Sequence, residues 1–144
     1  MTCLPDVNVW IALVVEQHIH HAAARRWFEE AQDDSLAFCR VTQTGFMSLL
    51  TNPRVMAEDA LTPSRAWQLL DMFYEDSRIL FAAEPPGLEA SWRVLTKARV
   101  PGANFWTDAY LAAFASAAGH TLVTFDRSFH RFDKLKLRWL VAGP

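Results

Sequence analysis

Short apolar stretches alternate with amphipathic stretches along this chain. Five apolar runs have the length of buried strands, and they cover residues 2–5, 36–39, 79–82, 121–125 and 137–141. Between them, apolar side chains recur three and four positions apart, the spacing of a helix with one buried face, over residues 21–32, 43–50, 63–74, 88–98 and 107–118. Because strands and helices alternate, the pattern predicts an α/β fold in which helices cover both faces of a mainly parallel sheet.

Capping residues mark the ends of several of these helices. Thr62 offers a capping hydroxyl directly before Pro63, which favours the first turn of a helix. Thr107 is the predicted cap of the 107–118 helix, and Gly119 stands where a left-handed residue ends it. The segment Val9–Val15 is too apolar for a surface helix, so we expect it to pack under the sheet.

Composition narrows the class of protein. The 144 residues are 51% hydrophobic with a net charge of −2, which excludes disorder and fits a single domain over residues 1–144. The longest apolar run, Val9–Val15, is far shorter than the roughly 20 residues of a membrane span. No Lys or Arg precedes Arg25, so a secretory signal is not expected, and Cys3 and Cys39 suit buried thiols of a reducing compartment. We therefore expect a soluble cytoplasmic protein.

Positive charge is concentrated near the C-terminus. Residues 127–144 contain one acid, Asp133, and five basic residues: Arg127, Arg131, Lys134, Lys136 and Arg138. Such a basic strip on an acidic body can hold a polyanion such as an RNA backbone. A merely solvated surface is the commoner reason for a run of this kind, so the strip supports other evidence and does not stand alone.

Three aspartates stand at the ends of predicted elements. Asp6 follows the first strand, Asp126 follows the strand at 121–125, and Asp108 lies in the first turn of the helix between them. That helix advances about 16 Å from Asp108 to Gly119, and the strand returns about 16 Å. Since open parallel sheets bind ligands beyond the carboxyl ends of their strands, we expect the three carboxylates to meet there.

Carboxylates that meet repel each other unless a proton or a cation intervenes. A hard divalent ion, Mg²⁺ or Mn²⁺, prefers oxygen ligands and stabilises charge on a phosphate under attack. Each acid alone has a simpler explanation, because Asp108 suits the helix dipole and Asp6 and Asp126 suit turns. Their shared location favours the metal site.

Several segments together resemble a known family. They are Leu4–Trp10, Phe38–Gln43 leading to Leu49–Pro53, Thr107–Ala113, and Leu122–Asp126 with Phe129. In their order and spacing they resemble the PIN-domain ribonucleases, and most closely the VapC-type toxins of bacterial toxin–antitoxin systems. The resemblance covers nearly the whole chain.

The resemblance implies a PIN-like (Rossmann-like) three-layer α/β/α sandwich, usually dimeric, that cuts RNA with Mg²⁺ or Mn²⁺. It also implies a VapB-type antitoxin that obstructs the site. By this comparison Asp6 and Asp108 bind the metal directly, and Asp126 acts through a water or a second ion. The family commonly has a Glu early in the helix after the second strand, where this chain has Gln43 and Gly45. The missing charge predicts weaker metal binding.

Aromatic and histidine residues offer further candidates. Trp106 precedes Asp108 together with Asn104 in a predicted loop, where it would stack on an unpaired base or anchor the loop against the core. His18, His20 and His21 have the composition of a zinc site, but such spacing commonly falls on solvated loops. The 63–74 helix is apolar over a broad face, which suits a dimer or antitoxin surface and core packing equally well.

The sequence thus predicts a metal-dependent endoribonuclease. Catalysis is assigned to Asp6, Asp108 and Asp126, and RNA binding to four residues: Gln43, Asn104, Trp106 and Arg127. Water would attack the phosphorus in line and leave a 5′-phosphate and a 3′-hydroxyl. A tRNA or rRNA loop is the expected substrate, because unpaired bases are the readable ones. The alternative is a catalytically weak or inactive PIN-like module that binds RNA or protein.

Overall fold

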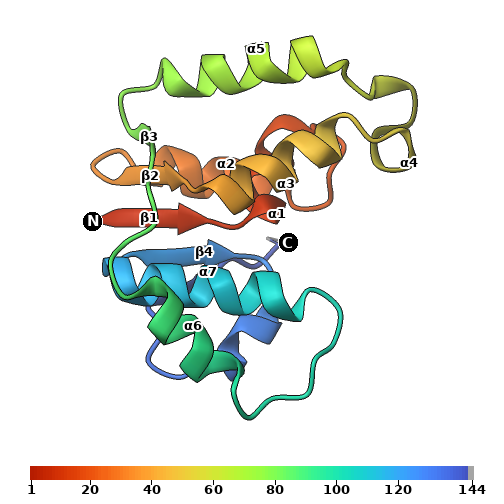
Figure 1. Cartoon of the computed structure of the whole chain (residues 1–144). Helices are drawn as coiled ribbons and strands as arrows, with labels where there is room; N and C mark the ends of the chain where they lie inside the picture. The colour runs from red at the N-terminus through yellow and green to blue at the C-terminus, as the bar shows by residue number, and fades with distance from the viewer. Residues whose placement is uncertain (143–144) are drawn as a thin grey trace.

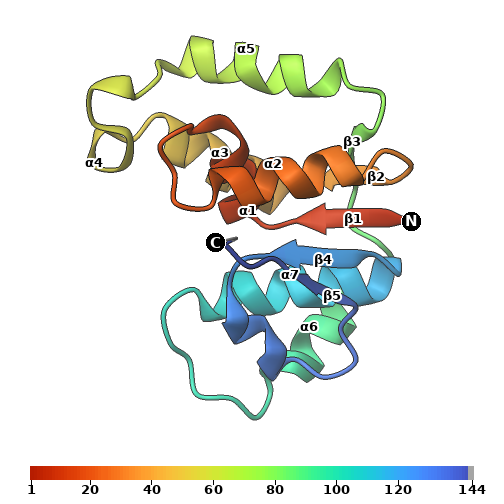
Figure 2. The ribbon, with the colours of Figure 1, turned by 180° about the vertical axis from the view of Figure 1, so that it is seen from behind.

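Five short strands form one parallel sheet with the spatial order β3-β2-β1-β4-β5. The computed structural model describes residues 1–142. The strands are β1 (Thr2–Pro5), β2 (Ser35–Phe38), β3 (Ile79–Phe81), β4 (Thr121–Thr124) and β5 (Leu137–Trp139). The chain builds the sheet outward from β1 to β3, then returns to place β4 on the other side of β1 (Figures 1 and 2). The order reverses between β1 and β4, and ligands of open α/β sheets bind at such a point.

Helices flank the strands in the connections. The α-helices are α1 (Val7–Val14), α2 (His21–Glu30), α3 (Arg40–Leu50), α4 (Pro53–Met56), α5 (Pro63–Tyr74), α6 (Leu88–Thr96) and α7 (Phe105–Ala118). Two 3₁₀ turns, η1 (Ala57–Asp59) and η2 (Arg127–Arg131), complete the set. In Figure 1, α5 lies above α3, whereas α6 and α7 lie together on the opposite side of β1. No helix within residues 1–142 has both the length and the apolar character to cross a membrane.

Two hydrophobic cores lie on the two faces of the sheet. Neighbouring residues of β1 separate them, because Cys3 packs with α1, α2, α3 and α5, whereas Leu4 packs with α6 and α7. β4 divides in the same way, with Val123 in the first core and Leu122 in the second. Alternate strand residues point to opposite faces, so a strand buried on both sides is apolar throughout. The predicted three-layer α/β/α sandwich with a parallel sheet is confirmed.

The cap residue Asp6 explains why the first helix begins at Val7. Asp6 has extended backbone dihedrals, and its Oδ1 accepts a hydrogen bond from the Val7 amide at 2.7 Å. This bond satisfies one of the donors left free at a helix start. The apolar segment predicted at Val9–Val15 is therefore a helix, α1, whose residues Val9 and Trp10 are buried beneath the sheet as expected.

The predicted start of α7 is wrong by two residues. The helix begins at Phe105, and its cap is Asn104 in a left-handed conformation with φ of 58°, not Thr107. Phe105 is buried, so its packing draws the first turn into the fold before the predicted capping hydroxyl is reached. Trp106 therefore stands on the first turn of a helix and not in a loop, whereas Gly119 ends the helix with φ of 69° as predicted.

Candidate functional site

Asp6 lies at the carboxyl end of the central strand, where the sheet order reverses. Besides capping α1, its carboxylate accepts hydrogen bonds at Oδ2 from the Thr124 hydroxyl at 3.0 Å and from the Asn8 amide at 3.2 Å. The Asn8 amide also donates to Thr124 Oγ1 at 3.2 Å. A carboxylate has about four acceptor sites, so three hydrogen bonds fix its orientation and leave capacity for one more ligand.

The protonation of Asp6 reflects its surroundings. The pKa of Asp6 is raised to about 6, mainly by burial and also by the charges of Asp108 and Asp126, against the lowering effect of the hydrogen bonds from Thr124 and Val7. A nearby cation stabilises the ionised form of a carboxylate that is desolvated and close to two other carboxylates. Asp6 is therefore a suitable ligand for a divalent ion.

Asp126 and Asp108 come from two other elements. Asp126 caps η2 two residues after the end of β4, with Oδ1 accepting from the Ser128 amide at 2.8 Å. Asp108 lies in the first turn of α7 with only 14% of its side chain exposed, and its Oδ2 contacts Nη2 of Arg131 at 3.1 Å. Burial raises the pKa of Asp108, which the Arg131 guanidinium opposes and the Asp126 charge reinforces.

The three aspartates are thus within electrostatic reach of one another at one edge of the sheet. They do not form a ready-made cage, since no set of three acidic, histidine or cysteine side chains in residues 1–142 is arranged to hold a metal ion. Mg²⁺ does not require one, because it keeps several waters and is usually bound through one or two carboxylates and the substrate's phosphate. The donor set of Asp6 and Asp108 fits such an ion, with Arg131 as the present counter-charge of Asp108.

Three residues of this site were not found from the sequence. Thr124 is fully buried and joins β4 to Asp6, and Asn8 connects the same two elements. A polar residue in an apolar strand was the available signal for Thr124, and the position two residues after Asp6 was the signal for Asn8. Arg131 belongs to the predicted basic strip, but no local pattern indicates that it folds back onto Asp108.

Gln43 and Gly45 occupy the region where the family commonly has a Glu. Gln43 is 7% exposed, and its amide is bonded to Arg40 through Oε1 and to the Tyr74 hydroxyl through Nε2 at 3.4 Å. A Cβ atom at Gly45 would lie 2.8 Å from Cγ2 of Val7, the residue after Asp6. The backbone at Gly45 therefore approaches the start of α1 too closely to carry a side chain there.

The other predicted RNA-binding residues lie at different distances from the aspartates. Arg127 follows Asp126, and its guanidinium lies over the Trp139 ring at 4.8 Å. Asn104 caps α7, and Trp106 stands two residues before Asp108. Two residues along a helix differ by about 200° in direction, so Trp106 and Asp108 point to opposite sides of the first turn. Trp106 is consequently separated from the carboxylates by the helix itself.

The histidines have roles outside the acidic site. His20 stacks on Phe125 with a ring separation of 4.2 Å, and Nδ1 of His21 is bonded to the Ala12 carbonyl at 2.7 Å. His18 accepts a hydrogen bond from the His20 backbone amide at Nδ1. In the described part of the chain these rings do not form a three-ligand metal site.

Comparisons with known proteins identify the fold and the family. Residues 3–135 match the PIN domain family model. The ribonuclease VapC41 of Mycobacterium tuberculosis is 42% identical over 142 residues, covering 95% of this chain and 97% of that protein. Ribonuclease VapC39 of the same species is 35% identical over 133 residues, covering 88% and 89%.

Solved structures share the architecture at lower identity. VapBC2 from Rickettsia felis, bound to a DNA fragment from its promoter, matches with a TM-score of 0.72 and 17% identity over 98% of this chain and all of that one. Mycobacterium tuberculosis VapC20, a sarcin-ricin loop cleaving toxin, matches with a TM-score of 0.68 and 18% identity over 94% and 98%. The resemblance predicted from the sequence is confirmed: this chain belongs to the PIN-domain family, and its relatives there are the VapC ribonucleases.

Proposed function

We propose that this chain is a divalent-metal-dependent endoribonuclease, the toxin of a toxin–antitoxin pair, and that it hydrolyses RNA phosphodiester bonds until a VapB-type antitoxin neutralises it. The observation that carries the proposal is the partly buried Asp6, whose negative charge is repelled by those of Asp108 and Asp126 from two other elements. Relatives named as ribonucleases match nearly the whole chain, which supports the same activity. The relatives do not favour the binding-only module.

The proposed metal ligands are Asp6 and Asp108, with Mg²⁺ or Mn²⁺ as the ion. When bound, the ion would supply positive charge to the scissile phosphate and lower the pKa of an attacking water. The Asp6 carboxylate is held in place by Thr124 and Asn8, so it needs little reorganisation to serve as a ligand. Asp126 would orient the attacking water or accept its proton.

Arg131 changes how this site must work. Its guanidinium holds Asp108 through the same Oδ2 atom that would bind the ion. Metal binding would therefore loosen or share this contact. A released Arg131 would be free to donate to a phosphate oxygen of the RNA, since guanidinium groups bind phosphate through two donors.

RNA would approach along the carboxyl ends of β1 and β4. Arg127, which is exposed beside Asp126, is the proposed backbone contact there. At the start of α7, Asn104 and Trp106 would contact the bound RNA. Gln43 is buried against Arg40, so its proposed part in binding RNA is to position that guanidinium.

The partners follow from the same relatives. VapBC complexes from Rickettsia felis, Haemophilus influenzae and Salmonella typhimurium share this fold, which supports a VapB-type antitoxin for this chain. We further propose a homodimer that acts in the cytoplasm on a tRNA or rRNA loop.

The decisive test replaces one proposed ligand. Asp108→Asn should abolish Mn²⁺-dependent cleavage of total RNA, because the amide removes a negative ligand, while circular dichroism shows an unchanged fold. Asp133→Asn, which removes an exposed acid from the same region, is the matched control and should cleave like the wild type. EDTA should stop cleavage by both active proteins. Full cleavage by Asp108→Asn would refute the assignment, and RNA binding without cleavage by the wild type would favour the binding-only module.

A further inference from the structure

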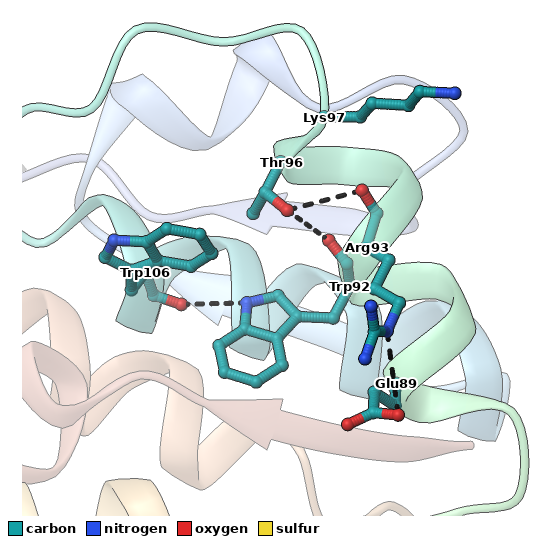
Figure 3. Close-up of a pocket in the computed structure, with 6 residues that line it drawn as sticks. All are labelled: Glu89, Trp92, Arg93, Thr96, Lys97 and Trp106. Carbon is teal, nitrogen blue, oxygen red and sulfur yellow. Dashed lines mark hydrogen bonds and ion pairs between the residues drawn. The ribbon is translucent and has the colours of Figure 1, made fainter.

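A pocket of about 480 Å³ opens at the corner between α6 and the first turn of α7. Figure 3 shows its lining, which consists of Glu89, Trp92, Arg93, Thr96, Lys97 and Trp106. It lies on the opposite side of the first turn of α7 from Asp108. The helix between them is about 10 Å across. The pocket is therefore separate from the acidic site but close to it.

Two indoles form the walls of this pocket. The Trp92 and Trp106 rings are nearly perpendicular, at 88°, with centroids 6.0 Å apart. Nε1 of Trp92 donates to the Trp106 backbone carbonyl at 3.1 Å, which fixes Trp92 as one wall and anchors the turn that carries the other (Figure 3). Trp106 is 58% exposed, so its ring contributes little to either core. An indole held in place while exposed presents a ready surface for stacking.

Two polar groups of the pocket walls, the Thr96 hydroxyl and the Trp92 indole nitrogen, are already engaged. The Thr96 hydroxyl donates to the backbone carbonyls of Trp92 at 2.9 Å and Arg93 at 3.3 Å, and Figure 3 shows both contacts. With the Trp92 nitrogen also bonded, the walls present mainly aromatic faces, and the Trp106 indole nitrogen is the wall donor left without a partner among the described residues. Such walls suit a flat aromatic ligand bound by stacking, and they offer few hydrogen bonds with which to distinguish one base from another.

The rim of the pocket carries two cations and one acid. Glu89 and Arg93 pair with each other at 3.6 Å, whereas Lys97 has no ion-pair partner within residues 1–142. Beyond Lys97, Nη2 of Arg99 donates to the Arg131 carbonyl at 2.6 Å, and Arg131 contacts Asp108. Lys97 at the pocket, Arg99 two residues later and Arg131 at Asp108 thus supply cations for the phosphates of a bound RNA strand.

We propose that this pocket holds an unpaired base of the RNA substrate, stacked on Trp106, while the adjoining phosphates contact Lys97 and Arg99. The inference rests on the endoribonuclease function proposed above and names a subsite for it on the far side of α7. The positive rim favours RNA over an apolar segment of a protein partner, which gains nothing from Lys97 and Arg99. Because stacking on Trp106 requires only an aromatic face, binding depends on the presence of a base and only weakly on its identity.

Binding can be measured without cleavage by titrating a fluorescein-labelled single-stranded oligoribonucleotide in EDTA and following its anisotropy. Trp106→Ala should weaken binding about 10-fold, within the range found when a stacking aromatic is removed. Trp106→Phe retains a ring and should restore most of the affinity. Val94→Ala is the control, because Val94 lies on α6 with 74% exposure but does not line the pocket, and it should leave binding unchanged.

A second measurement locates the base. A set of oligoribonucleotides with one abasic position moved along the strand should show one position where the wild type loses affinity and Trp106→Ala loses nothing further. Exchange of the base at that position should change affinity by less than about 3-fold. Equal binding by Trp106→Ala and the wild type would overturn the proposal. The proposal would also be overturned if Trp106→Ala lost binding to a VapB-type antitoxin but kept its RNA affinity. The pocket would then be a protein-docking site.

The two proposals fail separately. Asp108→Asn should bind the oligoribonucleotide at least as tightly as the wild type, because it removes a negative charge and loosens Arg131, although it does not cleave. If the wild type fails to cleave RNA with Mn²⁺ but Trp106→Ala still weakens binding, the base subsite stands and the ribonuclease function does not. If cleavage is normal and Trp106→Ala changes neither binding nor cleavage, only the subsite is refuted.

Discussion

Asp108 is a carboxylate with two possible counter-ions, one within the protein and one from solution. Its side chain is only 14% exposed, and that of Arg131 is 30% exposed, so their contact at 3.1 Å is partly shielded from water. The stacking of the Arg131 guanidinium on the Phe132 ring at 4.6 Å and the hydrogen bond from Arg99 to the Arg131 carbonyl hold this arginine in place. The protein therefore neutralises a proposed metal ligand with its own cation.

Replacement of Arg131 tests whether the two cations compete. Arg131→Met retains the contact with Phe132 but removes the charge, so Asp108 no longer has a competing partner. The dissociation constant for Mn²⁺, measured by titration calorimetry, should fall about 5-fold, which corresponds to about 1 kcal/mol for a partly exposed ion pair. Arg138→Met is the control, because Arg138 pairs with Glu30 on α2 and should not affect metal binding. Unchanged or weaker Mn²⁺ binding by Arg131→Met would show that the ion pair does not compete.

At the residue scale, the sequence predicted the acids but not their partners. Asp6, Asp108 and Asp126 stand at element ends, where the periodicity of the neighbouring strand or helix makes them visible. Arg131 lies 23 positions after Asp108 and meets it only through tertiary folding. Side chains that converge through the fold leave no local pattern, which is why the ion pair was missed.

At the element scale, α1 and α3 cross closely at Gly45. Gly45 of α3 faces Val7 in the first turn of α1, and a Cβ at position 45 would lie 2.8 Å from Cγ2 of Val7. Glycine inside a helix is otherwise unfavourable by about 1 kcal/mol relative to alanine. Close packing explains its presence here, because any larger residue at position 45 would have to displace the Val7 side chain.

A pair of substitutions tests this crossing. Gly45→Ala should lower the free energy of unfolding by about 1 kcal/mol or more, because overpacking outweighs the better helix propensity. Adding Val7→Ala should recover part of that loss, so the two changes should be non-additive in urea unfolding. Gly102→Ala is the control and should be close to neutral, since a Cβ at position 102 would meet no atom of the described residues within 4 Å. Stabilisation by Gly45→Ala alone would contradict the close approach.

Element types were predictable, and their ends only in part. Periodicity identified the strands and the longer helices, and Thr62 and Gly119 mark ends that the structure shares. α3 begins at Arg40, three residues before the prediction, because Thr42 Oγ1 accepts from the Cys39 amide and caps the earlier turn. α4, η1 and η2 are too short for periodicity to reveal. Burial of a single side chain such as Phe105 decides a helix start that local signals place elsewhere.

At the scale of the whole molecule, sheet order gathers the site and disperses the basic strip. Because β1 and β4 are neighbours, the acids that follow them meet at one edge. The basic residues of the tail instead reach different parts of the structure, with Arg131 on Asp108, Arg138 on Glu30 and Arg127 over Trp139. Three of the five basic residues of the strip thus contact separate partners, which their run along the sequence does not indicate.

This dispersal predicts which cation of the strip matters for RNA. Arg127 lies beside Asp126 near the carboxyl end of β4, where the RNA strand would pass. Arg138, within β5, is paired with Glu30 of α2. Loss of one cationic side chain that contacts a phosphate should reduce the slope of log affinity against log salt concentration by about 0.7 for single-stranded RNA. Arg127→Ala should show that reduction in anisotropy titrations at several salt concentrations, and Arg138→Ala, which removes the same charge, should keep the wild-type slope. Equal reductions in both variants would mean that RNA senses the net charge of the tail and not the position of Arg127, and the path proposed along β1 and β4 would be wrong.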